Sequence, residues 1–304
     1  MHVGNYGAVM GLAGLGLTAR VAASVWPGVV KAPAYLTEPW VLLGLIALLV
    51  LMALYFRKGI WGVKADFTNP MLFGYCGALP VGMALVAGGI GSYSHEAGVW
   101  LWWLAFALFT TCQVWALVRL LSGGFELAQI NPGWLIILVG GIVLPGPGMQ
   151  LGLSEASHFT FGVSATVAPI LMALLFYRVV AGPPVPEALR PTWFILLVPP
   201  SLIYVNGLAL FPEAIFLENL FYFALALGVA LLICARGFSR WPFGPAWWAF
   251  TFPLDALAYA AARYAQDHPA PLWRGVCAAT LLLATAAVLI VLLRTLRNAA
   301  LRRA

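Results

Sequence analysis

Charged side chains are scarce in this chain of 304 residues: only 9% are Asp, Glu, Lys or Arg, while 63% are hydrophobic. An ordinary soluble domain carries about 25% charged residues. A soluble fold of this size must coat its surface with polar groups, and this sequence has too few of them. Lipid tolerates an apolar surface when the backbone satisfies its own hydrogen bonds. The composition therefore excludes a soluble globular protein and predicts a helical membrane protein.

Long polar segments are missing as well. A single transmembrane domain over residues 1–304 is therefore expected, without a separate soluble domain. The first apolar run begins within a few residues of Met1, and no basic region precedes it. For this reason we do not expect a cleavable signal peptide.

Cysteine and histidine are rare, with four residues of each. The cysteines all fall in apolar runs without a C-x-x-C pair, which favours buried and inert side chains: Cys76, Cys112, Cys234 and Cys277. The histidines fall in loops or at helix ends, where they cannot form facing haem ligands: His2, His95, His158 and His268. No cluster has metal-ligand spacing, and no nucleophile stands beside a base. The sequence therefore argues against an enzyme and predicts neither a metal nor a cofactor.

Ten runs of largely apolar residues have about the length of 20 residues that a membrane span needs. They cover roughly residues 5–24, 36–56, 70–91, 97–121, 132–152, 159–180, 191–211, 214–235, 246–265 and 272–293. Turn residues or charges separate them, as at Arg57-Lys58-Gly59. We predict an all-α polytopic membrane protein with ten transmembrane helices, paired as five helical hairpins.

The basic residues are unevenly distributed between the two ends of these spans. Twelve of the sixteen lie beside the loops after spans two, four, six and eight or in the C-terminal tail: Arg57, Lys58, Lys64, Arg119, Arg178, Arg190, Arg236, Arg240, Arg294, Arg297, Arg302 and Arg303. The other end has Arg20, Lys31, Arg263 and Arg274. The positive-inside rule then places both termini in the cytoplasm, and we expect a multi-pass protein of the cytoplasmic membrane. Because the basic residues form no stripe on a soluble face, nucleic-acid binding is not expected.

The odd-numbered spans share a proline pattern. Spans three, five, seven and nine begin with a proline, followed in three of them by tryptophan two residues on. Each carries further prolines near its middle: Pro80, Pro145 with Pro147, Pro199 with Pro200, and Pro253. Such prolines kink a helix, and the even spans lack them apart from Pro169. Broken backbone survives at membrane depth only inside protein or beside a cavity, so we expect the odd helices to ring a central pore.

Glycine takes the place of proline in span one. Gly11 and Gly14 are candidates for pore-lining backbone, and Gly140 is a further candidate in span five. The alternative for Gly11 is close helix packing, because Gly7-x-x-x-Gly11 is a packing motif. Both interpretations stay open, since a glycine on a pore-lining helix can do both.

Four stretches carry a specific resemblance to a known family: residues 7–17, 131–145, 191–200 and 247–253, the last reading Trp-Trp-Ala-Phe-Thr-Phe-Pro. The chain resembles the tellurite-resistance/dicarboxylate transporter family, which includes bacterial TehA and the slow-type anion channels of plant guard cells. The resemblance implies five hairpins in a ring and a homotrimer with one pore in each subunit. It also implies that Phe252, the residue before Pro253, is an aromatic gate. The alternative is that Phe252 simply packs between helices.

Two functions fit this resemblance. The first is a gated channel that conducts small inorganic anions such as chloride and nitrate, with the pore of each subunit occluded by Phe252. The alternative is a carrier or exporter of C4-dicarboxylate, sulfite or tellurite, with proton coupling as one form. A single ring without inverted halves around a charged site favours the channel. Because no Lys or Arg is expected in mid-span, backbone N–H groups at the kinks should select large, weakly hydrated anions.

Asp255 is the only carboxylate expected deep within a span. A buried carboxylate is costly when charged and usually faces a cavity or a partner. It follows Phe252 by three residues, so the two side chains share one face of the helix. Asp255 is a candidate for ion selectivity or proton coupling, and the alternative is a position near the cavity mouth without a role.

Overall fold

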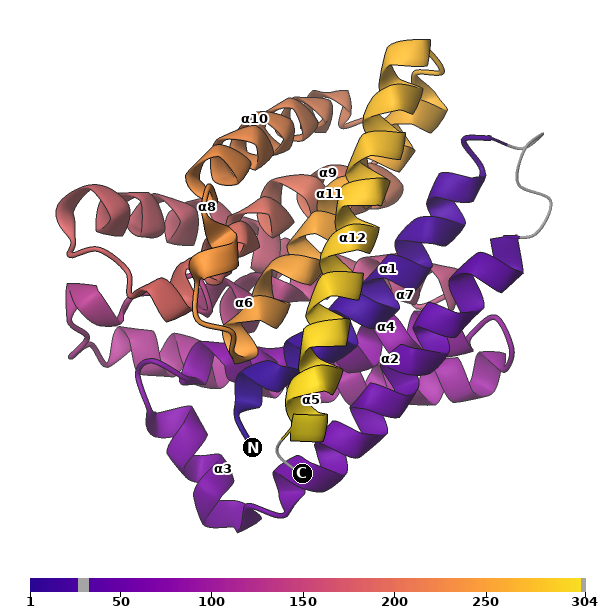
Figure 1. The fold of residues 1–304 in the computed structure, drawn as a ribbon. Helices are drawn as coiled ribbons and strands as arrows, with labels where there is room; N and C mark the ends of the chain where they lie inside the picture. The colour runs from indigo at the N-terminus through magenta and orange to yellow at the C-terminus, as the bar shows by residue number, and fades with distance from the viewer. Residues whose placement is uncertain (27–32, 302–304) are drawn as a thin grey trace.

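The computed structural model describes residues 1–26 and 33–301, and its regular structure over these ranges is helical (Figure 1). Three basic residues used in the charge argument, Lys31, Arg302 and Arg303, lie outside the described residues. The predicted all-α fold is confirmed. The odd and even helices differ in how they are built and where they lie.

The odd helices are broken into short pieces. In chain order they are η1 (Val3–Tyr6) with α1 (Gly7–Ala23), η2 (Phe73–Gly77) with α4 (Ala78–Ile90), α6 (Trp134–Val139) with η4 (Gly140–Ile142) and α7 (Pro145–Gln150), η5 (Glu187–Leu197) with α9 (Val198–Leu210), and η8 (Pro245–Phe250) with α11 (Thr251–Asp267). The even helices are continuous: α2 (Pro33–Phe56), α5 (His95–Leu121), α8 (Ser154–Ala181), α10 (Glu218–Cys234) and α12 (Pro271–Leu301).

The predicted count of ten spans is not exact. Among the described residues, eight helical segments are long and apolar enough to cross a membrane. Predicted span 132–152 is a shorter apolar segment, Trp134–Gln150, and predicted span 246–265 is divided into η8 and the 17 residues of α11. Both exceptions are odd helices that break at glycine or proline, so the count fails where the backbone is most interrupted.

Burial separates the two sets of helices into an inner and an outer ring. In the most apolar stretch of each of the three odd segments that are long enough to span a membrane, 61%, 89% and 78% of the residues are buried. In the five even helices the buried share is between 17% and 33%. The hairpin order is visible in Figure 1, where α2 runs beside α1 and α12 beside α11. The even helices therefore present apolar side chains to lipid, and the odd helices form the interior, as expected.

The prolines break the inner helices by restarting them. Three of the four proline-containing inner helices begin as a 3-10 helix, and the α-helix that follows carries proline within its first three residues, as at Pro80, Pro199 and Pro253. In the fourth, η4 precedes α7, which starts at Pro145. A proline in the first turn of an α-helix costs no helical hydrogen bond, because a backbone N–H at that position would have no partner within the helix. The expected mid-helix kinks are thus junctions between 3-10 and α segments.

Side chains from neighbouring helices satisfy carbonyl groups where the fifth predicted span is broken. Gln113 Nε2 donates to Leu138 O at 2.7 Å, and Asn206 Nδ2 donates to Ile142 O at 2.6 Å. The indole of Trp102 donates to the carbonyl of Leu144 at 3.0 Å. Irregular backbone is tolerated at membrane depth only when such partners replace the lost helical bonds.

Three smaller features differ from the expectations. Residues 59–68 form a short helix, α3 (Gly59–Thr68), where a loop was expected. Pro39 lies inside α2, although Pro169 was the only interior proline expected in an even helix. Cys234 is exposed at the end of α10 and Cys112 is half-buried, whereas Cys76 and Cys277 are buried as predicted.

Candidate functional site

Two cavities follow one another along the axis of the inner ring. The first cavity lies toward the starts of the inner helices and encloses about 550 Å³ of empty space, counting its open mouth. It is lined by residues of all five inner helices, including Gly7 and Met10, Ala78 and Val81, Val139 and Gly140, Ile195 and Pro199, and Trp248 and Phe252. The second cavity lies further along the same helices and encloses about 480 Å³. Its lining includes Gly14 and Thr18, Leu85, Pro147 and Gln150, Leu202 and Asn206, and Ala256 and Tyr259.

Phe252 lies between the two cavities. It lines both of them, and Val143 of the opposing inner helix is the other residue that they share. The Phe252 side chain is 5% exposed. Val143 carries no sequence signal, because it is one valine within an apolar run, so sequence reasoning missed it.

Glycine on α1 makes room for Phe252. A Cβ atom added to Gly14 would lie 2.8 Å from Cδ2 of Phe252, closer than real Cβ contacts. Gly11, one turn earlier, lies instead directly against Thr251 of α11. The two glycines of α1 therefore occupy different places: Gly14 is beside the phenyl ring in the second cavity, and Gly11 is at the packing contact between α1 and α11.

The candidate prolines are divided between cavity walls and helix packing. Pro199 and Pro253 line the first cavity, as does the candidate Gly140. Pro80, Pro145 and Pro200 are buried in the inner helices but are not among the lining residues. Sequence position alone could not separate these groups, because each depends on the rotation of its helix about its axis.

Asp255 is fully buried at the seam between α11 and α1, away from the lining of either cavity. Neither carboxyl oxygen has a hydrogen-bond partner among the described residues. A Cβ atom on Gly14 would lie 3.1 Å from Oδ2 of Asp255, and the Thr18 hydroxyl donates to the Asp255 backbone carbonyl at 3.2 Å. Gly14 is thus the common neighbour of Phe252 and Asp255.

The two cavities differ in polarity. The side chains around the first cavity are apolar except for Tyr75 and Trp248, whereas Thr18, Gln150, Asn206 and Tyr259 face the second. Among the described lining residues of both cavities there is no Lys, Arg, Asp or Glu. A solute in this path would meet hydroxyl, amide and backbone groups and no fixed charge.

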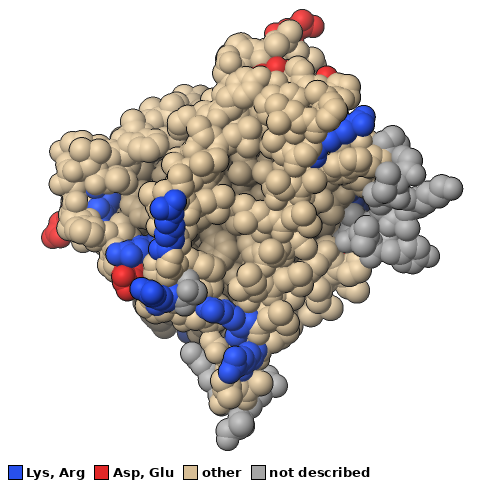
Figure 2. All heavy atoms as spheres, turned by 45° about the horizontal axis from the view of Figure 1, so that its top comes forward, with Lys and Arg blue, Asp and Glu red and all other residues tan. Residues whose placement is uncertain are grey.

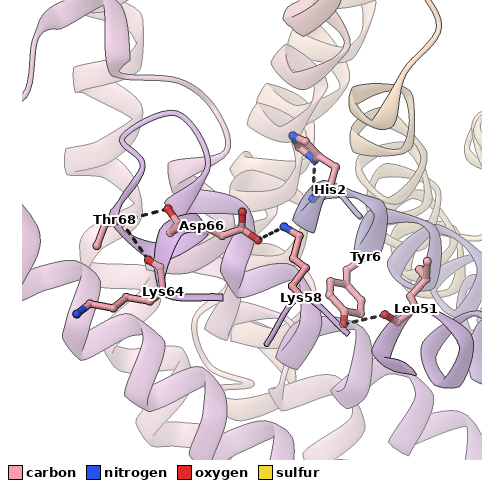
Figure 3. A network of polar contacts seen from close by, with 9 residues as sticks. His2, Tyr6, Leu51, Lys58, Lys64, Asp66 and Thr68 are labelled. Atoms are coloured by element: carbon pink, nitrogen blue, oxygen red, sulfur yellow. Dashed lines mark hydrogen bonds and ion pairs between the residues drawn. The ribbon is translucent and has the colours of Figure 1, made fainter. Parts of the chain in front are cut away.

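A polar network that sequence reasoning missed lies beside the first cavity (Figure 3). Lys58 Nζ forms a 2.7 Å ion pair with the buried carboxylate of Asp66 in α3. His2 Nδ1 accepts a hydrogen bond from the Gly4 N–H at 3.0 Å and so caps η1. Its ring packs edge-on against Tyr75, and both Gly4 and Tyr75 line the first cavity. The network depends on α3, which the sequence did not indicate.

Protonation of His2 should destabilise the fold. Burial lowers the pKa of His2 below its ordinary value of 6.5, an effect that nearby Lys58 and the amino terminus reinforce and Asp66 opposes. The neutral ring is favoured in the folded state, so its stabilising effect is complete above pH 6.5 and is lost as the pH falls below that value. We expect the melting temperature of the wild type to fall relative to that of His2→Asn between pH 7.5 and pH 5. Asparagine can cap η1 without titrating, and parallel melting curves for the two proteins would contradict this expectation.

Charge differs between the two ends of the ring. The first cavity lies toward the end that carries ten of the thirteen basic residues that the structure describes. Six of the ten carboxylates lie at the opposite end: Glu38, Glu96, Glu155, Glu213, Glu218 and Asp267. Figure 2 shows a line of Lys and Arg side chains along one side of the molecule and a group of Asp and Glu side chains at the end uppermost in the view. We call these the basic end and the acidic end.

Comparison of the sequence with known proteins identifies the family to which this chain is similar. The family described as SLAC1, voltage-dependent anion channel, matches residues 1–296. The chain is 28% identical over 240 residues to the S-type anion channel SLAH2 of Arabidopsis thaliana, covering 73% of this chain and 45% of the relative. It is 22% identical over 305 residues to the S-type anion channel SLAH3 of the same plant, covering 98% and 48%. An uncharacterised transporter of Methanocaldococcus jannaschii is 24% identical over 277 residues, covering 82% and 80%.

The plant relatives are much longer proteins. This chain spans about half the length of the curated plant relatives it matches, at 45% and 48% in the two cases above. The archaeal relative has a similar extent. The matched family is described by a channel activity and not by an enzymatic one, which agrees with the expectation that the chain is not an enzyme.

Proposed function

Because this chain belongs to the SLAC1 family, described as voltage-dependent anion channels, we propose that it is a gated channel for small inorganic anions such as chloride and nitrate. The chain is a multi-pass membrane protein, and its inner helices surround the proposed pathway. The pathway runs from the first cavity to the second, and Phe252 is its gate. A single observation carries this proposal: Phe252 lines both cavities and, with Val143, forms the wall that they share.

Selectivity in this proposal rests on weak donors. The path contains no fixed charge among the described lining residues, so an anion is solvated by backbone N–H groups and by hydroxyl and amide groups in the second cavity. Weak binding favours conduction, because an ion held tightly does not leave. The cost of dehydration then decides between anions, and nitrate should pass more easily than chloride.

The setting of the channel also belongs to the proposal. Residues 1–304 form one transmembrane domain in the cytoplasmic membrane, with the basic end and both termini in the cytoplasm. The subunits assemble as a homotrimer with one pore each. The even helices, whose apolar side chains face outward, supply the surfaces toward lipid and neighbouring subunits.

The test of this function is electrical. Purified protein in planar bilayers should carry anion current in symmetric chloride or nitrate once the Phe252 side chain is shortened, with larger current in nitrate. A protein that carries no current in either salt but moves a dicarboxylate or sulfite across vesicle membranes would instead be a carrier.

One observation favours the carrier as a second candidate. Asp255 is a fully buried carboxyl group without a described partner, and it shares the neighbour Gly14 with Phe252. An unpaired charge there would be costly, so the neutral, protonated form fits the site. If proton binding at Asp255 drives transport, Asp255→Asn should abolish the dependence of flux on a pH gradient. In the channel, Asp255→Asn should leave ion preference and pH dependence unchanged, and flux measurements in pH-clamped vesicles distinguish the two.

A further inference from the structure

Arg294 of α12 is a positively charged side chain that has no carboxylate partner among the residues that the structure describes. Its guanidinium Cζ lies 4.6 Å from the ring centroid of Trp247 and 6.0 Å from that of Phe243. Cation–π attraction to the two rings fixes its position without neutralising its charge. The ion pairs formed by the described residues all involve other side chains.

A groove lies next to Arg294 at the basic end: Arg294 is not one of its lining residues, but its ring partner Phe243 and its chain neighbour Thr295 are. It is lined by Asn5 of η1, Phe243 and Trp248 near η8, and Thr295 and Asn298 of α12, and it encloses about 880 Å³ of empty space, counting its open side. Asn5 and Asn298 offer side-chain amides to this groove, whereas the Thr295 hydroxyl already donates to the Val291 carbonyl at 2.8 Å. Trp248 also lines the first cavity, and its Nε1 donates to Thr295 Oγ1 at 3.2 Å. The groove and the first cavity are therefore neighbours, with the Trp248 indole between them.

The groove lies beyond the hydrocarbon core. The 31 residues of α12 extend over roughly 46 Å at 1.5 Å per residue. A span needs only about 20 residues, so about one third of the helix projects from the hydrocarbon region. Thr295 and Asn298 belong to the projecting end, which places the groove in contact with water and dissolved ions.

We propose that this groove is the site where the conducted anion is collected before it enters the first cavity, with Arg294 as its electrostatic anchor. The inference rests on the proposed anion conduction. A guanidinium without a carboxylate partner among the described residues, close to the side-chain amides of Asn5 and Asn298, attracts small inorganic anions and raises their local concentration at the mouth. Because the site is open to water, it holds such anions weakly and releases them to the path.

The neighbouring Arg297 provides a matched control. It lies one turn further along α12, is exposed, and does not stack on an aromatic ring among the described residues. At about 100° per residue it points about 160° away from Thr295 and Ala299 and about 100° away from Asn298, which line the groove, whereas Arg294 lies only about 40° from Asn298. If the arginines only set the membrane topology, replacing either one should have the same effect on the anion current. If the groove collects anions, only the replacement of Arg294 should reduce the current.

The functional test uses channels opened by Phe252→Ala. At about 10 mM salt, Arg294→Gln should reduce the current of anions entering from the basic end about threefold, and the difference should vanish near 1 M, where the Debye length falls from about 30 Å to about 3 Å. Arg297→Gln should leave the current unchanged, and Arg294→Lys should retain most of it. Equal currents for Arg294→Gln and Arg297→Gln at low salt would overturn the collecting site while leaving anion conduction intact.

A second measurement locates the site independently of conduction. Crystals of the protein grown in bromide should show anomalous scattering from bromide within the groove beside Arg294, and crystals of Arg294→Gln should lack it. If Phe252→Ala carries no anion current, the proposed function fails and the bromide site alone decides whether the groove binds anions. A groove without bromide in the wild type would overturn the proposal.

Discussion

Replacing Phe252 with alanine should raise the anion conductance of the purified protein at least about tenfold, which requires lowering the barrier by only about 1.4 kcal/mol. Phe252 is the larger of the two side chains that line both cavities, the other being Val143, and it is 5% exposed. Shortening it joins two existing spaces, because Gly14 beside the ring has no side chain to fill the gap. The measurement is the current in planar bilayers at a fixed amount of protein.

Phe250→Ala is the control for this experiment. Phe250 is also 5% exposed and lies two residues before Phe252, but it packs against Phe194, Phe238 and Trp247 on the side away from the two cavities. This truncation should weaken packing without opening the path. If both variants conduct equally, loosened packing and not removal of a gate explains the current.

Gly77→Ala should cause a large loss of stability, about 3 kcal/mol or more, at the upper end of what overpacking costs. A Cβ atom at Gly77 would lie 2.6 Å from the Ile137 Cα atom and 2.7 Å from the Ile136 carbonyl oxygen. Both are backbone atoms, so no side chain can turn away to relieve the clash. The two inner helices would have to separate. Thermal unfolding in detergent, followed by the loss of monodisperse protein, measures this effect.

Gly162→Ala provides the opposite expectation. Gly162 lies within α8, and a Cβ atom there would meet nothing within 4 Å among the described residues. Alanine should be neutral or stabilise the helix by about 0.5–1 kcal/mol. Equal melting temperatures for Gly77→Ala and Gly162→Ala would contradict the close contact between the backbone at Gly77 and the backbone of α6.

The ring of inner helices could be predicted because its signal is local. Proline and tryptophan at the starts of alternate spans, and a second proline near the middle, are visible without knowledge of any contact. Gly14 was a candidate because the first span is rich in glycine, whereas Phe252 was a candidate gate through the family resemblance. The form of each break was not predictable, because a proline pattern does not distinguish a mid-helix kink from a 3-10 segment followed by a new helix.

Features that depend on long-range contacts could not be predicted. The ion pair between Lys58 and Asp66 requires α3, whose ten residues are too short and mixed for a periodic signal. In the sequence Arg294 was only one basic residue among many, and its position depends on the packing of α12 against residues 243–247. The polar residues Gln113 and Asn206 did offer a signal, since each interrupts an apolar span and caps broken backbone.

The most direct test of the account is the reversal potential of the Phe252→Ala current in a chloride gradient. The account predicts a reversal potential close to the chloride equilibrium potential, which changes sign when the gradient is inverted. Nitrate on one side should shift it in the direction of higher nitrate permeability. A reversal potential near zero, or one that follows the cation gradient, would contradict an anion-selective path closed by Phe252.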